Sequence, residues 1–164
     1  MSQIKKTVRI KIHSELYDVE ESLFSEDNAN VDNLPVNEES PEPQILDINT
    51  VGTYVDDGER VSISYDESEA TGMEGSTTTV TFLKAEPTIV SMMREGLVST
   101  TLVFENDKRH HCLYKTPFMP FEICVRTINV SNSLLGVGAL SLDYVVEIRG
   151  AQAERTKFSM QILN

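Results

Sequence analysis

The strongest constraint on the fold is a period-two alternation of apolar and polar residues that recurs along the chain. The clearest case is SLDYVVEIR, residues 141–149, where Leu142, Tyr144, Val146 and Ile148 would share one face of a strand. Successive side chains of a strand point to opposite faces, so this pattern predicts a half-buried strand. The same alternation occurs in residues 8–12, 61–67, 121–127 and 156–162. Helical periodicity is almost absent, and we predict an all-β protein.

Further strand candidates lie between these segments, at residues 45–55, 77–85, 87–94, 97–105 and 109–116. Together they give about ten strands, several joined by short turn signals such as DDG, AEP, REG and ENDK. Tight connections between consecutive strands favour antiparallel pairing. About ten twisted antiparallel strands with one apolar face each form a closed barrel or a sandwich, and closure also removes exposed sheet edges.

The size and the cysteine content indicate one domain in a reducing compartment. The chain has 164 residues, 40% of them hydrophobic, which suits a single domain over residues 1–164. Cys112 and Cys124 are the only cysteines, fewer than a disulfide-stapled secreted domain carries. The N-terminal stretch has no apolar signal-peptide core, and no apolar run approaches the length of a membrane span. We therefore expect a cytoplasmic protein with free thiols and no membrane partner.

The net charge of −12 comes from one part of the chain. Residues 12–59 hold 14 acidic residues and no Lys or Arg, so the remainder has 12 acidic against 14 basic residues, a net of +2. This argues against a basic surface for nucleic acid. Within this region, residues 14–44 contain three prolines and no strand alternation. We interpret them as a long acidic insertion after the first strand, either a solvated loop or a lid with LYDVEESLF as a short helix across a barrel mouth.

The stretch RHHCLYKTP, residues 109–117, combines two histidines with a cysteine. Strand alternation would put His110, Cys112 and Tyr114 on one face and His111 on the other. No ligand spacing supports a metal site, and a Cys112–His110 pair would stand too far apart for a direct hydrogen bond. We therefore predict no catalytic residue, no metal and no cofactor. A hairpin that turns through residues 117–119 would place Cys112 directly opposite Cys124 on one sheet face, as two reduced thiols.

The order of several short motifs resembles a known family. YDE at 65–67 is followed by TTTVTF at 77–82, MREG at 93–96 and YKTPF at 114–118, and a final pair of strands follows a glycine. In order and spacing this is similar to the YwiB-like family, small uncharacterised bacterial proteins of unknown function. The resemblance covers nearly the whole chain and implies a calycin-like (lipocalin-like) antiparallel β-barrel of about 8–10 strands. It implies no activity, because function depends on the site and not on the fold.

Four polar residues are our candidates for a ligand site. Tyr65 and Glu67 continue the inward face of the strand at 61–67, Arg94 ends a strand, and Tyr114 lies in the YKTPF motif. A buried carboxylate is costly unless it is paired, so we hypothesise that Glu67 and Arg94 meet beside Tyr65 or Tyr114 at one end of the barrel. The contact would either close the barrel as an ion pair or anchor the head group of a ligand.

These residues favour a non-enzymatic protein that holds a small apolar or amphipathic ligand inside the barrel. The alternative is a protein-interaction module with a side-chain-filled barrel and an acidic docking segment. The volume left inside the barrel distinguishes the two.

Overall fold

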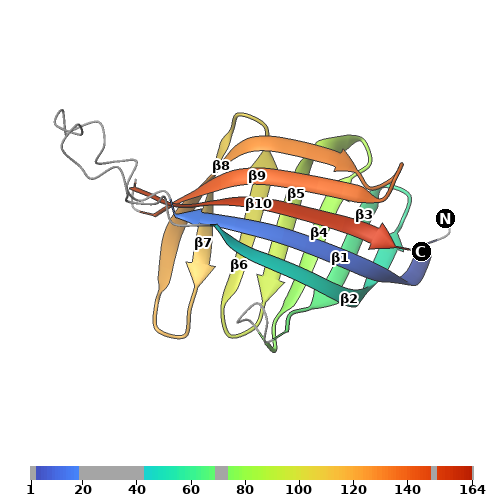
Figure 1. Ribbon diagram of the computed structural model, residues 1–164, viewed down its shortest axis with the longest axis horizontal. Coiled ribbons are helices and arrows are strands. Elements are labelled where there is room, and N and C mark those ends of the chain that lie inside the picture. Colours follow the sequence, from blue (N-terminus) through green and yellow to red (C-terminus); the bar gives the residue numbers. More distant parts are fainter. Residues whose placement is uncertain (1–2, 19–42, 69–73, 149–150, 164) are drawn as a thin grey trace.

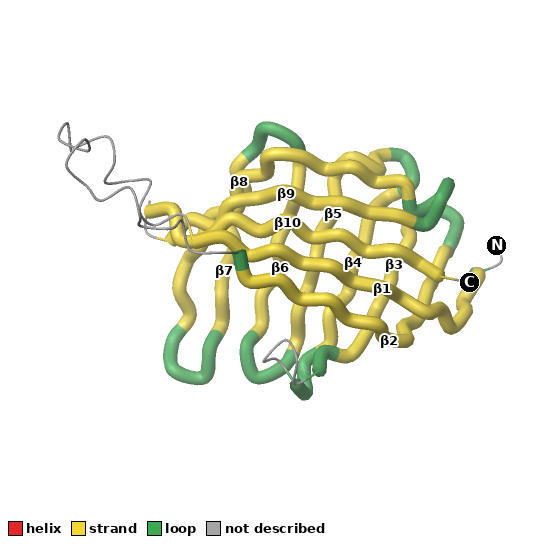
Figure 2. The backbone as a smooth tube through the Cα atoms, viewed as in Figure 1, coloured by secondary structure: helices red, strands yellow, loops and turns green. Residues whose placement is uncertain are grey.

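The computed structural model describes residues 3–18, 43–68, 74–148 and 151–163. These residues form ten strands and no helix (Figure 2). The strands are β1 (Ile4–Asp18), β2 (Gln44–Asp56), β3 (Arg60–Asp66), β4 (Thr77–Leu83), β5 (Glu86–Glu95), β6 (Ser99–Glu105), β7 (Arg109–Lys115), β8 (Pro120–Ser133), β9 (Ala139–Ile148) and β10 (Ala151–Leu163). Nothing in the described residues forms a helix of the length and apolarity needed to cross a membrane.

The strands form a closed antiparallel barrel in which each strand pairs with its neighbours in sequence and β10 pairs with β1 (Figure 1). This confirms the predicted all-β, calycin-like antiparallel barrel, and it is the barrel rather than the sandwich that forms. Closure leaves no edge strand, although β6 and β7 pair only through Ser99 with Lys115 and Thr100 with Tyr114. Most predicted strands are found within a few residues of their expected bounds, but β1, β8 and β10 are each longer than their alternating cores.

The acidic insertion is shorter than predicted. Residues 14–18 belong to β1, where Leu16 pairs with Gln44 and Tyr17 with Arg155, so the predicted lid helix cannot begin at Leu16. The rest of that segment, residues 19–42, lies outside the described residues.

Alternation gives the strands an apolar interior face and places most polar residues on the exterior. In β3, Val61, Ile63 and Tyr65 are buried while the residues between them are partly exposed. On the outer face, the hydroxyls of Ser64 and Thr79 lie 3.0 Å apart across β3 and β4. Such cross-strand pairs stabilise a sheet modestly, so the burial of the inward side chains provides most of the driving force.

The core fills one end of the barrel, which we call the packed end. This is the end where β1 begins, β10 finishes and the turns at 57–59, 84–85 and 106–108 lie. Phe104 is fully buried there, with its ring centroid 4.6 Å from that of Tyr144. The other core side chains with about 2% exposure or less include Val8, Ile10, Val61, Ile63, Val80, Val90, Val125, Leu140, Leu142 and Met160.

Gly52 of β2 lies close to its neighbouring strands. A Cβ at this position would come within 2.5 Å of both Ile10 Cδ1 and the Ser64 carbonyl oxygen. Any larger residue would therefore collide with the backbone of β3 and displace the end of the Ile10 side chain.

The predicted pairing of the two cysteines is wrong by one residue. The turn between β7 and β8 spans 116–119, so Cys112 pairs with Ile123, and Cys124 pairs with His111. A shift of one residue reverses the face of a side chain. Cys112 is therefore buried inside the barrel while Cys124 lies on the other face, and both are free thiols.

Candidate ligand-binding site

The other end of the barrel, which we call the cavity end, contains a cavity of about 490 Å³. Its lining residues come from the last part of β1, β3, β5, β7 and β9 and from the first part of β2, β6, β8 and β10. These parts meet at one end because neighbouring strands are antiparallel. The cavity volume falls within the range of about 300–1,000 Å³ that is usual for small-molecule sites.

On five strands, inward residues change from apolar to polar toward this end. In β3 the inward series is Val61, Ile63, Tyr65, followed by Glu67 just after the strand, and β4 runs Phe82, Val80, Thr78 in the same direction. The same change is seen in β5 (Val90, Met92, Arg94), β6 (Phe104, Leu102, Thr100) and β10 (Met160, Phe158, Thr156, Glu154). A barrel that only had to pack its interior would continue the apolar series on each strand.

Four of these polar residues and Tyr114 form one row across neighbouring strands, which we call the polar row. Tyr65 pairs with Thr78, Thr78 with Arg94, Arg94 with Thr100, and Thr100 with Tyr114. The row therefore runs from β3 to β7 with one inward residue on each strand. Directly paired residues in a sheet have Cβ atoms about 5 Å apart, so each side chain can contact the next.

Hydrogen bonds connect the β3 side of the row. The Arg94 Nε–H donates to Thr78 Oγ1 at 3.2 Å, and the Thr78 hydroxyl donates to Glu67 Oε1 at 2.9 Å. Thr78 is fully buried and Glu67 is 7% exposed, so these bonds satisfy groups that water does not reach. Thr78 lies between the two charges, and no direct ion pair joins Glu67 and Arg94 in the part of the chain that the structure describes.

Two tyrosines beside the charges remain protonated at neutral pH. Burial raises the pKa of Tyr65, and the negative charge of Glu67 raises it further, while Arg94 acts in the opposite direction. Burial also raises the pKa of Tyr144, which Arg94 again partly offsets. Both phenols are therefore neutral hydrogen-bonding groups in the wall of the cavity.

The β6 side of the row has an unsatisfied group. Thr100 is 6% exposed and lines the cavity, and its hydroxyl has no hydrogen-bond partner among the described residues. A buried polar group without a partner costs about 1–3 kcal/mol. The oxygen itself has almost no exposed surface, so it can contact a bound molecule only after the Thr100 side chain rotates toward the cavity.

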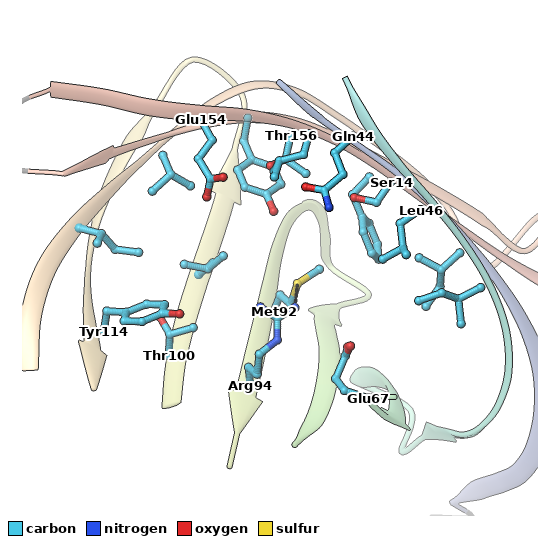
Figure 3. A pocket seen from close by; sticks show the side chains of 18 of the residues that line it. Ser14, Gln44, Leu46, Glu67, Met92, Arg94, Thr100, Tyr114, Glu154 and Thr156 are labelled. Carbon is cyan, nitrogen blue, oxygen red and sulfur yellow. Dashed lines mark hydrogen bonds between the residues drawn. The ribbon is translucent and has the colours of Figure 1, made fainter. Parts of the chain in front are cut away.

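The wall opposite the polar row is more apolar. Ile12, Leu16, Leu46, Ile48 and Phe158 line it from β1, β2 and β10. Figure 3 shows Leu46, Gln44 and Ser14 on this wall. Glu154 and Thr156 project from β10 and lie across the cavity from Arg94. The cavity therefore has one polar wall with a central cation and a facing wall of mixed character, in which Ile12, Leu16, Leu46, Ile48 and Phe158 form the apolar part.

All four residues predicted as ligand contacts line this cavity: Tyr65, Glu67, Arg94 and Tyr114. The structure brings Glu67 and Arg94 together through Thr78, where the sequence suggested direct contact. Whether these residues bind a ligand stays a prediction.

Sequence reasoning missed Thr78 and Thr100. Both lie two residues from a buried apolar residue of the same strand. The two-residue repeat of a strand was therefore sufficient to predict that their hydroxyls face inward. Their places beside Arg94 depend on the pairing register, which parity does not give.

The histidines and cysteines of RHHCLYKTP do not form a reactive site. His110 Nε2 lies 3.1 Å from Glu105 Oε1, and His111 Nδ1 lies 2.9 Å from Glu122 Oε1. Burial raises the pKa of the Cys112 thiol, and burial together with Glu147 raises that of Cys124. A reactive cysteine needs a lowered pKa, so neither thiol is activated as a nucleophile. Within the described ranges, no cluster of three or more His, Cys, Asp or Glu residues is arranged to hold a metal ion.

Comparison with known proteins agrees with this architecture. The model of the family described as "Domain of unknown function (DUF1934)" matches residues 33–160. The chain belongs to the DUF1934 family. A crystal structure of the ywiB protein from Bacillus subtilis is similar to the barrel with a TM-score of 0.64 and 16% sequence identity, over 96% of this chain and 94% of that one. The DUF1934 match and this structure confirm the predicted YwiB-like membership, and at this identity the structure supports the fold alone. No curated protein showed significant similarity to the chain.

Proposed function

We propose that this DUF1934 protein binds a small amphipathic molecule inside the cavity end of its barrel, without catalysing its conversion. The observation that carries the proposal is the cavity of about 490 Å³ with the polar row on one wall and aliphatic side chains on the other. A few convergent polar groups in a mainly apolar pocket are typical of small-molecule sites.

The structure offers a physical reason for keeping this space open. Filling the cavity with larger aliphatic side chains would bury more apolar surface and stabilise the barrel. The chain instead places a guanidinium and several hydroxyls there, which cost free energy to bury. Polar groups that destabilise the interior are best explained by a molecule that they contact.

The alternative, an interaction module with an acidic docking segment, requires a barrel filled by its own side chains. The packed end meets this requirement, but the cavity end does not. We therefore favour ligand binding. The proposal includes a cytoplasmic location, since two free thiols suit a reducing compartment.

Native mass spectrometry of the protein, purified without organic solvent or detergent, tests the proposal. We expect a population heavier than the polypeptide by the mass of one small molecule, and this excess should disappear when the protein is denatured. A polypeptide mass alone, together with no saturable binding of the neutral apolar dye N-phenylnaphthylamine, would contradict the proposal.

A further inference from the structure

Arg94 carries a charge that the described part of the protein does not neutralise by direct contact. Its Nε–H donates to Thr78 Oγ1, and its Nη2 donates to the weak acceptor Met92 Sδ at 4.0 Å. No carboxylate lies within 4.0 Å of the guanidinium among the described residues. A guanidinium has five N–H donors, and among the described residues the N–H groups at Nη1 and Nη2 have no oxygen acceptor.

The neighbouring carboxylate is already engaged on the other side. Glu67 accepts a hydrogen bond from the Thr78 hydroxyl, and its charge raises the pKa of Tyr65, which lies two residues before it, in β3. Its position toward β3 leaves the opposite side of Arg94, toward β6, without a negative charge from the polar row.

That opposite side presents the orphan hydroxyl. Thr100 pairs directly with Arg94 in the sheet, and its hydroxyl is a buried group that has no hydrogen-bond partner among the described residues. Tyr114 follows on β7 and also lines the cavity. A cation with unused donors and a hydroxyl with no partner thus lie side by side in the same wall.

We propose that the ligand is an organic acid whose anionic head group binds Arg94 and Thr100 and whose apolar part lies against β1, β2 and β10. The inference rests on the proposed function and adds the charge of the ligand. A carboxylate can accept two N–H groups of a guanidinium at once, and charge-assisted hydrogen bonds are about twice as strong as neutral ones. Glu154 projects from the opposite wall, so it repels an anion least when the head group lies close to Arg94 (Figure 3).

The cavity also limits the size of the acid. At roughly 30 Å³ for each atom the size of a water molecule, 490 Å³ holds about 16 non-hydrogen atoms. A medium-chain or compact aromatic acid fits inside this volume.

The test uses three probes with the same alkyl chain: decanoate, decanol and decylamine. Each is titrated at neutral pH against the wild-type protein containing N-phenylnaphthylamine, and displacement of the dye gives the affinities. We expect decanoate to bind about tenfold or more tightly than decanol, and decylamine to bind most weakly.

Two variants test whether Arg94 and Thr100 cause the preference for decanoate over decanol. In Arg94→Gln the advantage of decanoate over decanol should fall to about threefold or less, while the affinity for the neutral dye is retained. Thr100→Val keeps the side-chain shape and should reduce the advantage in part. Arg109→Gln is the matched control, because Arg109 lies on the outer face beside Glu147 and its loss should leave the preference unchanged.

The outcomes separate this inference from the proposed function. Three results would contradict an acidic ligand while leaving the proposed ligand cavity intact. They are equal binding of decanoate and decanol, tightest binding of decylamine, and an unchanged preference for decanoate in Arg94→Gln. If neither the dye nor any of the three probes binds the wild-type protein, the proposed function and the inference both fail.

Discussion

The packed end and the cavity end are built from the same ten strands, yet their interiors differ in kind. At the packed end the inward residues are aliphatic or aromatic and have almost no exposed surface. At the cavity end the same inward positions, one or two steps further along each strand, carry Tyr65, Thr78, Arg94 and Thr100 around an open volume. The change occurs on at least five strands. This indicates that the packed end stabilises the barrel, whereas the cavity end has a role other than stability.

The most direct way to test this division is to remove equivalent side chains at the two ends. Leu142→Ala at the packed end should destabilise the protein by about 4 kcal/mol, because it opens a new hole in a closely packed core. Leu102→Ala should cost about 2 kcal/mol, since Leu102 already borders the cavity. Urea unfolding measures both, and equal losses would contradict a mechanical difference between the ends.

The buried hydrogen bonds of Thr78 should be the main polar contribution to stability at the cavity end. Thr78→Val removes the group that binds both Arg94 and Glu67, and leaves a carboxylate that is 7% exposed without its donor. We expect a loss of about 2–3 kcal/mol in the free energy of unfolding. A loss below about 0.5 kcal/mol would show that the chain from Arg94 to Glu67 is not structural.

The neighbouring threonine should behave in the opposite way. Thr100→Val replaces a buried hydroxyl that has no described partner with a methyl group, so the ligand-free protein should become more stable by about 1 kcal/mol. Its matched control is Thr127→Val, because Thr127 is equally buried but its hydroxyl accepts the backbone N–H of Glu105 at 3.2 Å. The control should be destabilised. A gain in stability in both variants would mean that the missing hydrogen bond of Thr100 does not explain its effect.

A smaller effect is expected on the outer surface of the cavity end. His13 Nδ1 lies 2.6 Å from Asp47 Oδ1 and its Nε2 lies 2.9 Å from Glu15 Oε2. The hydrogen bond to Asp47, and to a smaller extent the one to Glu15, raises the pKa of His13 above 6.5. The protonated form is therefore favoured by folding, so its contribution is complete below pH 6.5 and is lost as the pH rises through the folded pKa.

Thermal unfolding between about pH 6 and pH 9 measures this contribution. The Tm of the wild-type protein should fall more with rising pH than the Tm of His13→Gln. Parallel pH profiles would show that the surface cluster does not stabilise the cavity end.

Alternation made the barrel and the inward residues predictable. Tyr65, Glu67 and Tyr144 were each expected to face inward from their distance to Ile63 or Leu142, and each does. The rule needs only the two-residue repeat of a strand, which the chain follows closely.

Contacts between strands were harder to predict because they depend on the length of each turn. The prediction of the β7–β8 turn placed Cys112 opposite Cys124, and a turn longer by one residue moved the two thiols to different faces. In β1, a polar Ser14 at an inward position interrupted the apolar series and concealed that the strand continues to Asp18. Both errors occurred where the cavity end departs from simple apolar packing.

The central claim, that the cavity end is a binding site, is tested most directly by filling it. Leu46 faces the cavity from β2, whereas its neighbour Ile45 is 56% exposed on the outer face. N-phenylnaphthylamine should bind the wild-type protein and Ile45→Trp with one site per chain, and Leu46→Trp should lose most of that affinity while remaining folded. Unchanged binding of the dye in Leu46→Trp would contradict the claim.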